Sequence, residues 1–151
     1  MSRVTASIDI AAPPERIWEV VMDPDRLGDW VSIHRDVEKV SDRPLRDGST
    51  LEQKLCLRGV NFHVRWKVAQ ARPGEEVVWD GRGPARSKAH TAYRLAPNGD
   101  GGTTFHYENE FKAPLGPLGA VASRALVGGL PEREARATLA NLKRVVEADA
   151  G

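Results

Sequence analysis

The chain has little from which a disulfide, a membrane anchor or a secretory leader could be built. Cys56 is the single cysteine among 151 residues, so no internal disulfide can form. No stretch approaches the roughly 20 consecutive apolar residues that a membrane-spanning helix needs. The first ten residues alternate apolar and polar side chains around a lone Arg3 and lack the apolar run of a secretory signal. We therefore expect a cytoplasmic protein without integral membrane association.

An excess of charge of one sign is also absent. The 22 Lys and Arg residues nearly cancel the 21 Asp and Glu residues, and both kinds are spread along the chain. Such a distribution gives no electrostatic indication of binding to nucleic acid or to an anionic membrane. Low-complexity segments and fixed-period repeats are missing as well, while 40% of the residues are hydrophobic. These features favour a single domain over residues 1–151 with a core of its own.

The histidines and the cysteine do not form a metal-binding or nucleophilic motif. His63, His90 and His106 fall on the polar faces of the expected strands, and no close-spaced Cys or carboxylate set accompanies them. Cys56 lies in a strand-like run without a recognisable activating motif. We therefore expect no metal and no cofactor.

The first thirty residues predict one strand followed by two short helices. Apolar and polar side chains alternate over Val4–Ile10, which is the period of a strand. Pro14 suits the first turn of a helix that runs to about Met22. Asp23-Pro24 breaks that helix, and Asp25 is positioned to cap a second one that extends to Trp30.

The middle of the chain predicts six further strands. Short Gly-rich or Pro-rich turns separate runs of alternating residues, as consecutive hairpins require. The expected result is an antiparallel meander. The strands are predicted at Val37–Ser41, Thr50–Leu57, Val60–Ala71, Glu75–Gly81, Arg86–Ala96 and Thr103–Lys112.

Beyond Pro114 the apolar residues return to a helical spacing that continues to Val146. Gly128-Gly129-Leu130-Pro131 interrupts this pattern, so we expect a kink or a break there. One strand, two short helices, six strands and a long helix do not alternate as βαβ units do. The order therefore predicts an α+β fold and excludes a parallel doubly wound sheet.

Strand alternation separates an inner face of the sheet from a solvent face. The inner face carries small side chains at one end and aromatic ones elsewhere, so its own atoms do not easily fill the interior. Apolar concavities with a few polar groups are typical of ligand sites. The alternative is that these residues pack a filled core and satisfy one another. The candidate ligand-binding residues are Gln53, Trp66, Trp79, Ser87, Thr91, Tyr93, Tyr107 and Asn109.

The order of elements and several local phrases resemble the START-like (helix-grip) superfamily, in its polyketide cyclase/dehydrase and lipid-transport group (SRPBCC). None of these phrases is a catalytic signature. The resemblance implies a seven-stranded curved antiparallel sheet around a long C-terminal helix, with a cavity for a hydrophobic or aromatic small molecule. The phrases are residues 8–18, 23–30, 93–97, 102–104 and 139–143, with Glu147.

Three functions follow from this resemblance and from the residues. The first is a carrier or sensor of a hydrophobic small molecule, either a ring compound or a lipid. The second is a polyketide aromatase, cyclase or dehydratase with Tyr93, Tyr107 and His34 as candidates for proton transfer. His34 follows Trp30 at the expected mouth of the cavity, although the sequence favours an exposed loop histidine there. The third is a protein-interaction module whose cavity is collapsed and whose charged outer sheet face makes the contacts.

The sequence leaves the choice between carrier and enzyme open. No strand places a carboxylate on the inner face, and tyrosine hydroxyls with an ordinary pKa near 10 are poor bases. Both observations argue against catalysis. The identity of the ligand and the oligomeric state, monomer or homodimer, stay open as well.

Overall fold

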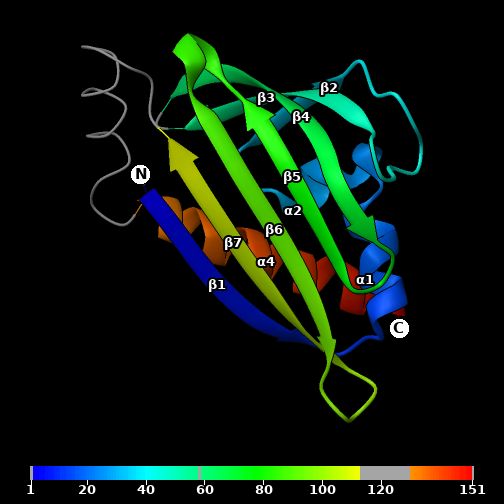
Figure 1. Ribbon diagram of the computed structural model, residues 1–151. Coiled ribbons are helices and arrows are strands. Elements are labelled where there is room, and N and C mark those ends of the chain that lie inside the picture. The colour runs from blue at the N-terminus through cyan, green and yellow to red at the C-terminus, as the bar shows by residue number, and fades with distance from the viewer. Residues whose placement is uncertain (1, 58, 113–129, 151) are drawn as a thin grey trace.

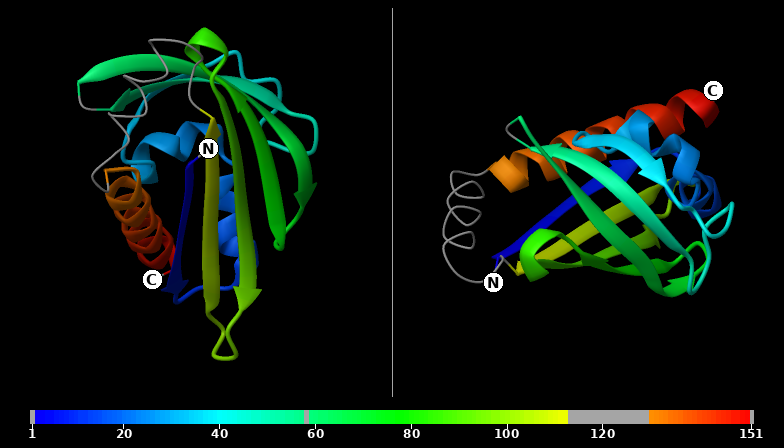
Figure 2. Two further views of the ribbon diagram at one scale, coloured as in Figure 1. Left: turned by 60° about the vertical axis from the view of Figure 1, so that its left-hand side comes forward. Right: turned by 90° about the horizontal axis from the view of Figure 1, so that it is seen from above.

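The computed structural model describes residues 2–57, 59–112 and 130–150. Seven strands form one antiparallel sheet in the order β1-β7-β6-β5-β4-β3-β2. The sheet curves around the C-terminal helix, and the short helices α1 and α2 lie beside that helix (Figures 1 and 2). The elements are β1 (Ser2–Ile10), α1 (Pro14–Val21), η1 (Pro24–Arg26), α2 (Leu27–Trp30), β2 (His34–Glu38), β3 (Thr50–Leu57), β4 (Val60–Arg72), β5 (Glu76–Arg82), η2 (Pro84–Arg86), β6 (Lys88–Pro97), β7 (Thr103–Lys112) and α4 (Leu130–Ala150).

The predicted α+β helix-grip fold is confirmed, because a curved antiparallel sheet precedes a C-terminal helix that packs against it. Six of the seven strands lie within about two residues of their predicted bounds. Residues 113–129 hold the first part of the predicted helical pattern and Gly128-Gly129 of the expected kink, and they lie outside the described residues. From Leu130 onward the chain is helical as predicted, in α4. None of the helices in the described ranges is long and apolar enough to cross a membrane.

Two local predictions near the N-terminus are corrected. The strand expected at Val37–Ser41 is β2, which begins at His34 and ends at Glu38. Lys39 has a φ of 52°, and this left-handed conformation ends the extended backbone. The cap residue of the second helical segment is Asp23, not Asp25, because the Asp23 carboxylate accepts a hydrogen bond from the Asp25 amide.

The start of β6 also differs from the prediction. Pro84–Arg86 form one 3₁₀ turn, so the strand begins at Lys88 instead of Arg86. Arg86 has a φ of 66°, and the Ser87 hydroxyl donates to the Pro84 carbonyl at 2.8 Å. The sequence pattern predicted a strand here because a single 3₁₀ turn is too short to show a helical period.

The core lies between the inner face of the sheet and the helices. Leu139, Leu142 and Val146 on α4 are buried against it, as are Val77 and Phe105 on the sheet. Hydrogen bonds fix α2 to α4. The Ser32 amide donates to the Thr138 hydroxyl, and the Asn141 side chain donates to the Trp30 carbonyl. These contacts hold the C-terminal helix across the open side of the curved sheet.

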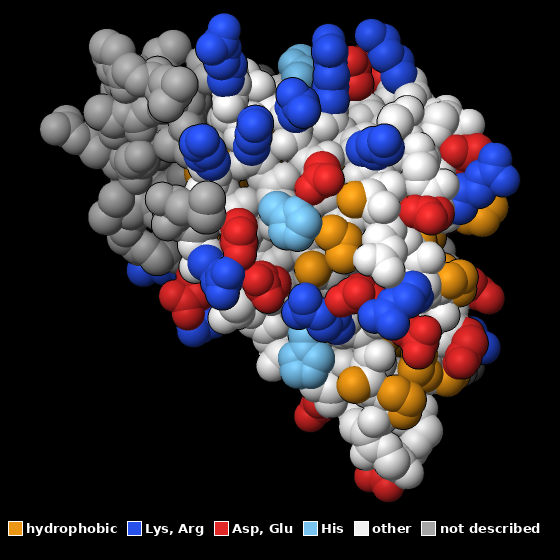
Figure 3. Space-filling model, in the orientation of Figure 1, with side chains coloured by type: hydrophobic (Ala, Val, Ile, Leu, Met, Phe, Trp, Pro, Cys, Tyr) orange, Lys and Arg blue, Asp and Glu red, His pale blue; other side chains and the backbone are white. Residues whose placement is uncertain are grey.

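The predicted alternation of β4 holds along most of the strand. Val64 and Val68 are buried on the inner face, while His63 and Arg65 are exposed on the outer face. Val60 is the exception, because it is 64% exposed. It lies at the tip of the β3–β4 hairpin, beyond Arg65, where pairing with β5 begins. The outer face carries charges of both signs (Figure 3).

Candidate functional site

Tyr93 lies at the centre of an aromatic cluster on the inner face. Its ring lies 5.8 Å from the ring of Tyr107, which it stacks on, and 5.4 Å from Phe105. Trp30 of α2 meets it edge-on at 5.9 Å. β6 and β7 place Tyr93 and Tyr107 directly opposite each other across the ladder. Sheet and helix therefore combine to form one aromatic wall.

The two tyrosine hydroxyls are protonated at neutral pH. Burial raises the pKa of Tyr107 to about 12 and raises that of Tyr93 further, with the neighbouring Tyr107 adding to the second shift. Among the described residues, no side chain hydrogen bond contributes to either shift. The hydroxyls can therefore donate hydrogen bonds to a ligand, and they are poorly suited to removing protons.

Trp30 is a member of the cluster that the sequence analysis did not include in the site. It was expected at the mouth, but it is only 1% exposed because α2 packs between α4 and the sheet. The indole Nε1 atoms of Trp30 and Trp79 are both buried, and neither has a hydrogen-bond partner among the residues that the structure describes. An indole N–H can only donate, so each of these groups would be satisfied by a hydrogen-bond acceptor.

Three side chains that lie on adjacent strands form a hydrogen-bonded chain. The Trp66 Nε1 donates to Gln53 Oε1 at 2.9 Å, and Gln53 Nε2 lies 2.9 Å from His34 Nδ1. Because the indole can only donate, Trp66 fixes which end of the Gln53 amide faces it. The amide nitrogen must then donate to His34 Nδ1. His34 accordingly carries its proton on Nε2.

Burial lowers the pKa of His34, and the negative charge of Asp36 opposes this shift only in part. The ring is therefore neutral at pH 7, in agreement with its role as an acceptor from Gln53. With Nδ1 occupied and Nε2 protonated, His34 has no free lone pair with which to act as a base. It can donate a hydrogen bond through Nε2.

Gly81 determines how Trp66 packs. A Cβ atom at Gly81 would lie 2.6 Å from the Trp66 ring, which is well inside van der Waals contact. The two residues are paired across β4 and β5, and the indole covers the bare glycine backbone. Trp66 in turn meets the ring of Trp79 edge-on at 6.3 Å. The sequence pattern places Gly81 at the end of a predicted strand and gives no signal of its contact with Trp66, so this contact was missed.

The remaining predicted polar contacts are divided between the sheet and the η2 turn. Thr91 and Asn109 face each other across β6 and β7, and the threonine hydroxyl donates to the asparagine carbonyl oxygen at 2.9 Å. Ser87 is buried, and its hydroxyl is engaged by Pro84. The predicted site residues thus form two groups. One group contains Gln53, Trp66 and Trp79. The other contains Tyr93 and Tyr107, with Thr91 and Asn109 two residues away on the same two strands.

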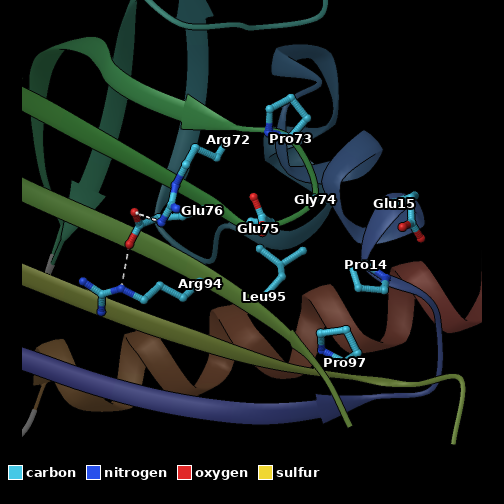
Figure 4. A pocket seen from close by; sticks show the side chains of 10 residues that line it. All are labelled: Pro14, Glu15, Arg72, Pro73, Gly74, Glu75, Glu76, Arg94, Leu95 and Pro97. Atoms are coloured by element: carbon cyan, nitrogen blue, oxygen red, sulfur yellow. Dashed lines mark hydrogen bonds and ion pairs between the residues drawn. The ribbon is translucent and has the colours of Figure 1, made fainter. Parts of the chain in front are cut away.

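A separate depression of about 440 Å³ lies near the β4–β5 turn and the start of α1 (Figure 4). Three of the charged residues that line it form ion pairs, since Glu76 lies 3.0 Å from Arg72 and 2.7 Å from Arg94. The hydrogen bonds from these two guanidinium groups hold the pKa of Glu76 below its usual value, and the bond from Arg72 has the larger effect. None of the predicted site residues lines this depression. The residues that line it are Pro14, Glu15, Arg72, Pro73, Gly74, Glu75, Glu76, Arg94, Leu95 and Pro97.

In the part of the chain that the structure describes, no three His, Cys, Asp or Glu side chains are grouped so that they could hold a metal ion. The inner face therefore offers aromatic rings, hydrogen-bond donors and a neutral imidazole. Such a set can bind a ring compound with oxygen acceptors.

Comparison with known proteins places this arrangement in a family. A sequence profile described as polyketide cyclase / dehydrase and lipid transport matches residues 1–147. The chain belongs to this family. The profile covers every strand of the sheet and most of α4, including all residues of the aromatic wall.

A curated relative and two solved structures are also similar to this chain over most of its length. Toxin Rv0910 of Mycobacterium tuberculosis is 26% identical over 134 residues, which cover 87% of this chain and 92% of the relative. The Zhui aromatase/cyclase from Streptomyces sp. R1128 superposes with a TM-score of 0.84 at 15% identity, over 99% of this chain and 96% of the other. TTHA0849 from Thermus thermophilus superposes with a TM-score of 0.80 at 19% identity, over 99% and 100% of the two chains. At these identities the two structures show a shared fold.

Proposed function

We propose that this protein binds a hydrophobic, ring-containing small molecule between the inner face of the sheet and α4, and that it acts as a carrier or sensor. The observation that carries the proposal is a pair of buried indole N–H groups, that of Trp30 beside Tyr93 and that of Trp79 beside Trp66. Neither has a hydrogen-bond partner among the described residues. A buried donor without an acceptor is costly, and a bound oxygen atom removes that cost. The interior cavity and the extent of the domain over residues 1–151 are part of this proposal.

The donors specify the polarity of the ligand. Trp79, Tyr93 and Tyr107 present N–H or O–H groups on the inner face. Trp30 presents its N–H from α2, and His34 adds a protonated Nε2. A flat ring system that carries carbonyl or phenolic oxygens complements these donors, and the rings of the wall offer surfaces for stacking. Compounds resembling aromatic polyketides have this composition.

Binding fits the chemistry of the wall better than catalysis does. Both tyrosines have raised pKa values, and the lone pair of His34 is taken by Gln53. The second candidate, an aromatase, cyclase or dehydratase, has support from the likeness to the Zhui aromatase/cyclase. In that case Tyr93 or Tyr107 would act as a hydrogen-bond donor to a developing oxyanion. The buried N–H groups of Trp30 and Trp79 give no support to the third function, a protein-interaction module with a collapsed cavity.

Equilibrium dialysis with 1,8-dihydroxyanthraquinone tests the proposal. We expect a dissociation constant of about 10 µM or lower, which corresponds to roughly 7 kcal/mol. Trp66→Leu removes an inner-face ring and weakens binding by about tenfold or more. Trp18→Leu is the matched control, since Trp18 belongs to α1 and lies outside the wall. No binding by the unaltered protein, or equal losses in both variants, would contradict a site on this face.

A further inference from the structure

Four cations face one another in a row across the outer face of the sheet. Arg65 of β4 pairs with Arg82 of β5, Arg82 pairs with Lys88 of β6, and Lys88 pairs with Lys112 of β7. We call these four residues the cationic row. They are separated by up to 47 positions in the sequence, so only the strand register brings them together. The balanced composition of the chain therefore hides a local concentration of positive charge.

The neighbouring row on the same face has a different character. Two residues further along each strand, Lys67 lies opposite Asp80, Asp80 opposite His90, and His90 opposite Glu110. Glu110 in turn forms an ion pair with Arg3. Acidic side chains alternate there with a lysine and a histidine, so no two like charges face each other. The cationic row departs from this pattern in all three of its pairs.

The cationic row is exposed and largely uncompensated. Arg65 lies 3.2 Å from Glu52, with its own side chain 79% exposed. Arg82, Lys88 and Lys112 are exposed, and none of them has an ion pair with any other described residue. Like charges directly opposite each other destabilise a sheet. A feature that reduces stability in three successive pairs indicates a function other than folding.

Further positive charge surrounds the row. Arg86 extends from the η2 turn with a φ of 66°, and Lys54 pairs with His63 on the adjoining strands. Figure 3 shows Lys and Arg side chains gathered along this edge of the molecule, above the mixed charges of the rest of the face. Val60, 64% exposed, lies at the tip of the hairpin that contains Lys54 and His63.

The shape and chemistry of this surface fit an anionic lipid bilayer. Strands lie about 4.8 Å apart, so four cations span roughly 14 Å of the outer face of the sheet. The outer positions of β3 to β7 carry no Phe, Tyr or Trp that could stack on bases, and the net charge of the chain is only +1. We propose that the cationic row docks the protein on anionic phospholipid surfaces, with Val60 at the margin of the contact.

Vesicle co-sedimentation tests this inference. We expect binding to vesicles in which about a third of the lipid is phosphatidylglycerol, and none to pure phosphatidylcholine vesicles. Salt at about 1 M should abolish binding because the screening length falls to about 3 Å. Lys88→Glu should weaken binding by about tenfold or more. Arg144→Glu on α4 makes the same change of charge at an exposed site away from the row and should leave binding within about twofold.

The melting temperature of the Lys88→Glu variant also tests whether misfolding could cause a loss of vesicle binding. Glutamate at this position faces both Arg82 and Lys112, so the variant should melt at the same temperature or higher than the unaltered protein. Equal loss of vesicle binding in the Lys88 and Arg144 variants would overturn the proposal. Tighter binding to a single-stranded RNA oligomer than to the vesicles would overturn it as well and assign the row to nucleic acid. The proposal does not depend on whether the inner face binds a ring compound.

Discussion

Gln53 illustrates how one side chain determines the state of its neighbours. Its amide accepts from Trp66 and donates to His34, so an indole on β4 sets the tautomer of an imidazole on β2. The identity of each residue was visible in the sequence. The connection was not, because it depends on the register of three strands and on the orientation of one amide.

Replacing Gln53 with glutamate tests this chain of hydrogen bonds. In Gln53→Glu the carboxylate still accepts from Trp66, but it now faces His34 Nδ1 with a negative charge. The protonated imidazole becomes the favoured form, so the pKa of His34 should rise above its usual value of about 6.5. NMR titration of the imidazole measures this change. An unaltered pKa in the variant would show that the two side chains do not interact.

Gly81→Ala tests the packing of Trp66. The new methyl group would lie 2.6 Å from the indole, so the ring must move from its place beside Trp79. We expect a loss of about 1–3 kcal/mol in the free energy of unfolding, measured with urea. Gly28→Ala is the control, since its Cβ would make an ordinary 3.5 Å contact with His34 in a helical segment. Comparable stability of the two variants would refute the close packing.

At the scale of the elements, alternation in the sequence was enough to assign both faces of the sheet. Phe105, Tyr107 and Trp66 lie on the inner face as predicted, because a period of two leaves no other choice once one face is apolar. The ends of β2 and β6 could not be predicted in the same way. The left-handed backbone at Lys39 and the short turn that ends at Arg86 do not change the alternation of apolar and polar residues in the sequence.

The same limit applies to the site. Alternation predicted the inner-face residues of β3 to β7, but Trp30 comes from a four-residue helix. Its burial depends on α4, which follows it by about a hundred residues and supplies Asn141 to its carbonyl. A contact of this range has no local signal. The cationic row could not be predicted from the sequence either, because its four residues are brought together only by the register of the strands.

Across β4, β5 and β6, Glu76 links two arginines on the outer face. Its side chain is 14% exposed and lies between Arg72 and Arg94, which lower its pKa. The ionised form is therefore favoured by folding, so this contribution is present above the unfolded pKa of about 4.5 and is lost as the pH falls through the lowered value. We expect Glu76→Gln to cost about 1 kcal/mol at pH 7 and close to nothing in strong acid. Urea unfolding across pH checks this, and an equal cost at both extremes would contradict it.

At the scale of the whole molecule, the fold supplies two faces with separate chemistry. The concave face carries rings and hydrogen-bond donors, and the convex face carries charge. The same strands build both, since successive side chains point to opposite sides. Family membership is consistent with either a carrier or an enzyme, and the difference must come from the groups on the concave face.

Tyr107→Phe separates a carrier from an enzyme. A carrier loses at most one hydrogen bond, so the affinity for 1,8-dihydroxyanthraquinone should stay within about tenfold of the unaltered protein. An enzyme that used this hydroxyl as an acid would lose turnover by about a hundredfold or more. Equilibrium dialysis gives the affinity. A loss of affinity well beyond tenfold with an unaltered fold would show that the hydroxyl does more than donate one hydrogen bond.

Native mass spectrometry of gently purified protein, followed by denaturing extraction, tests the central claim most directly. The account predicts a stoichiometric ring compound with oxygen acceptors, bound by the unaltered protein and reduced in Trp66→Leu. A protein that carries no such compound and also fails to bind 1,8-dihydroxyanthraquinone would contradict ligand binding on the inner face.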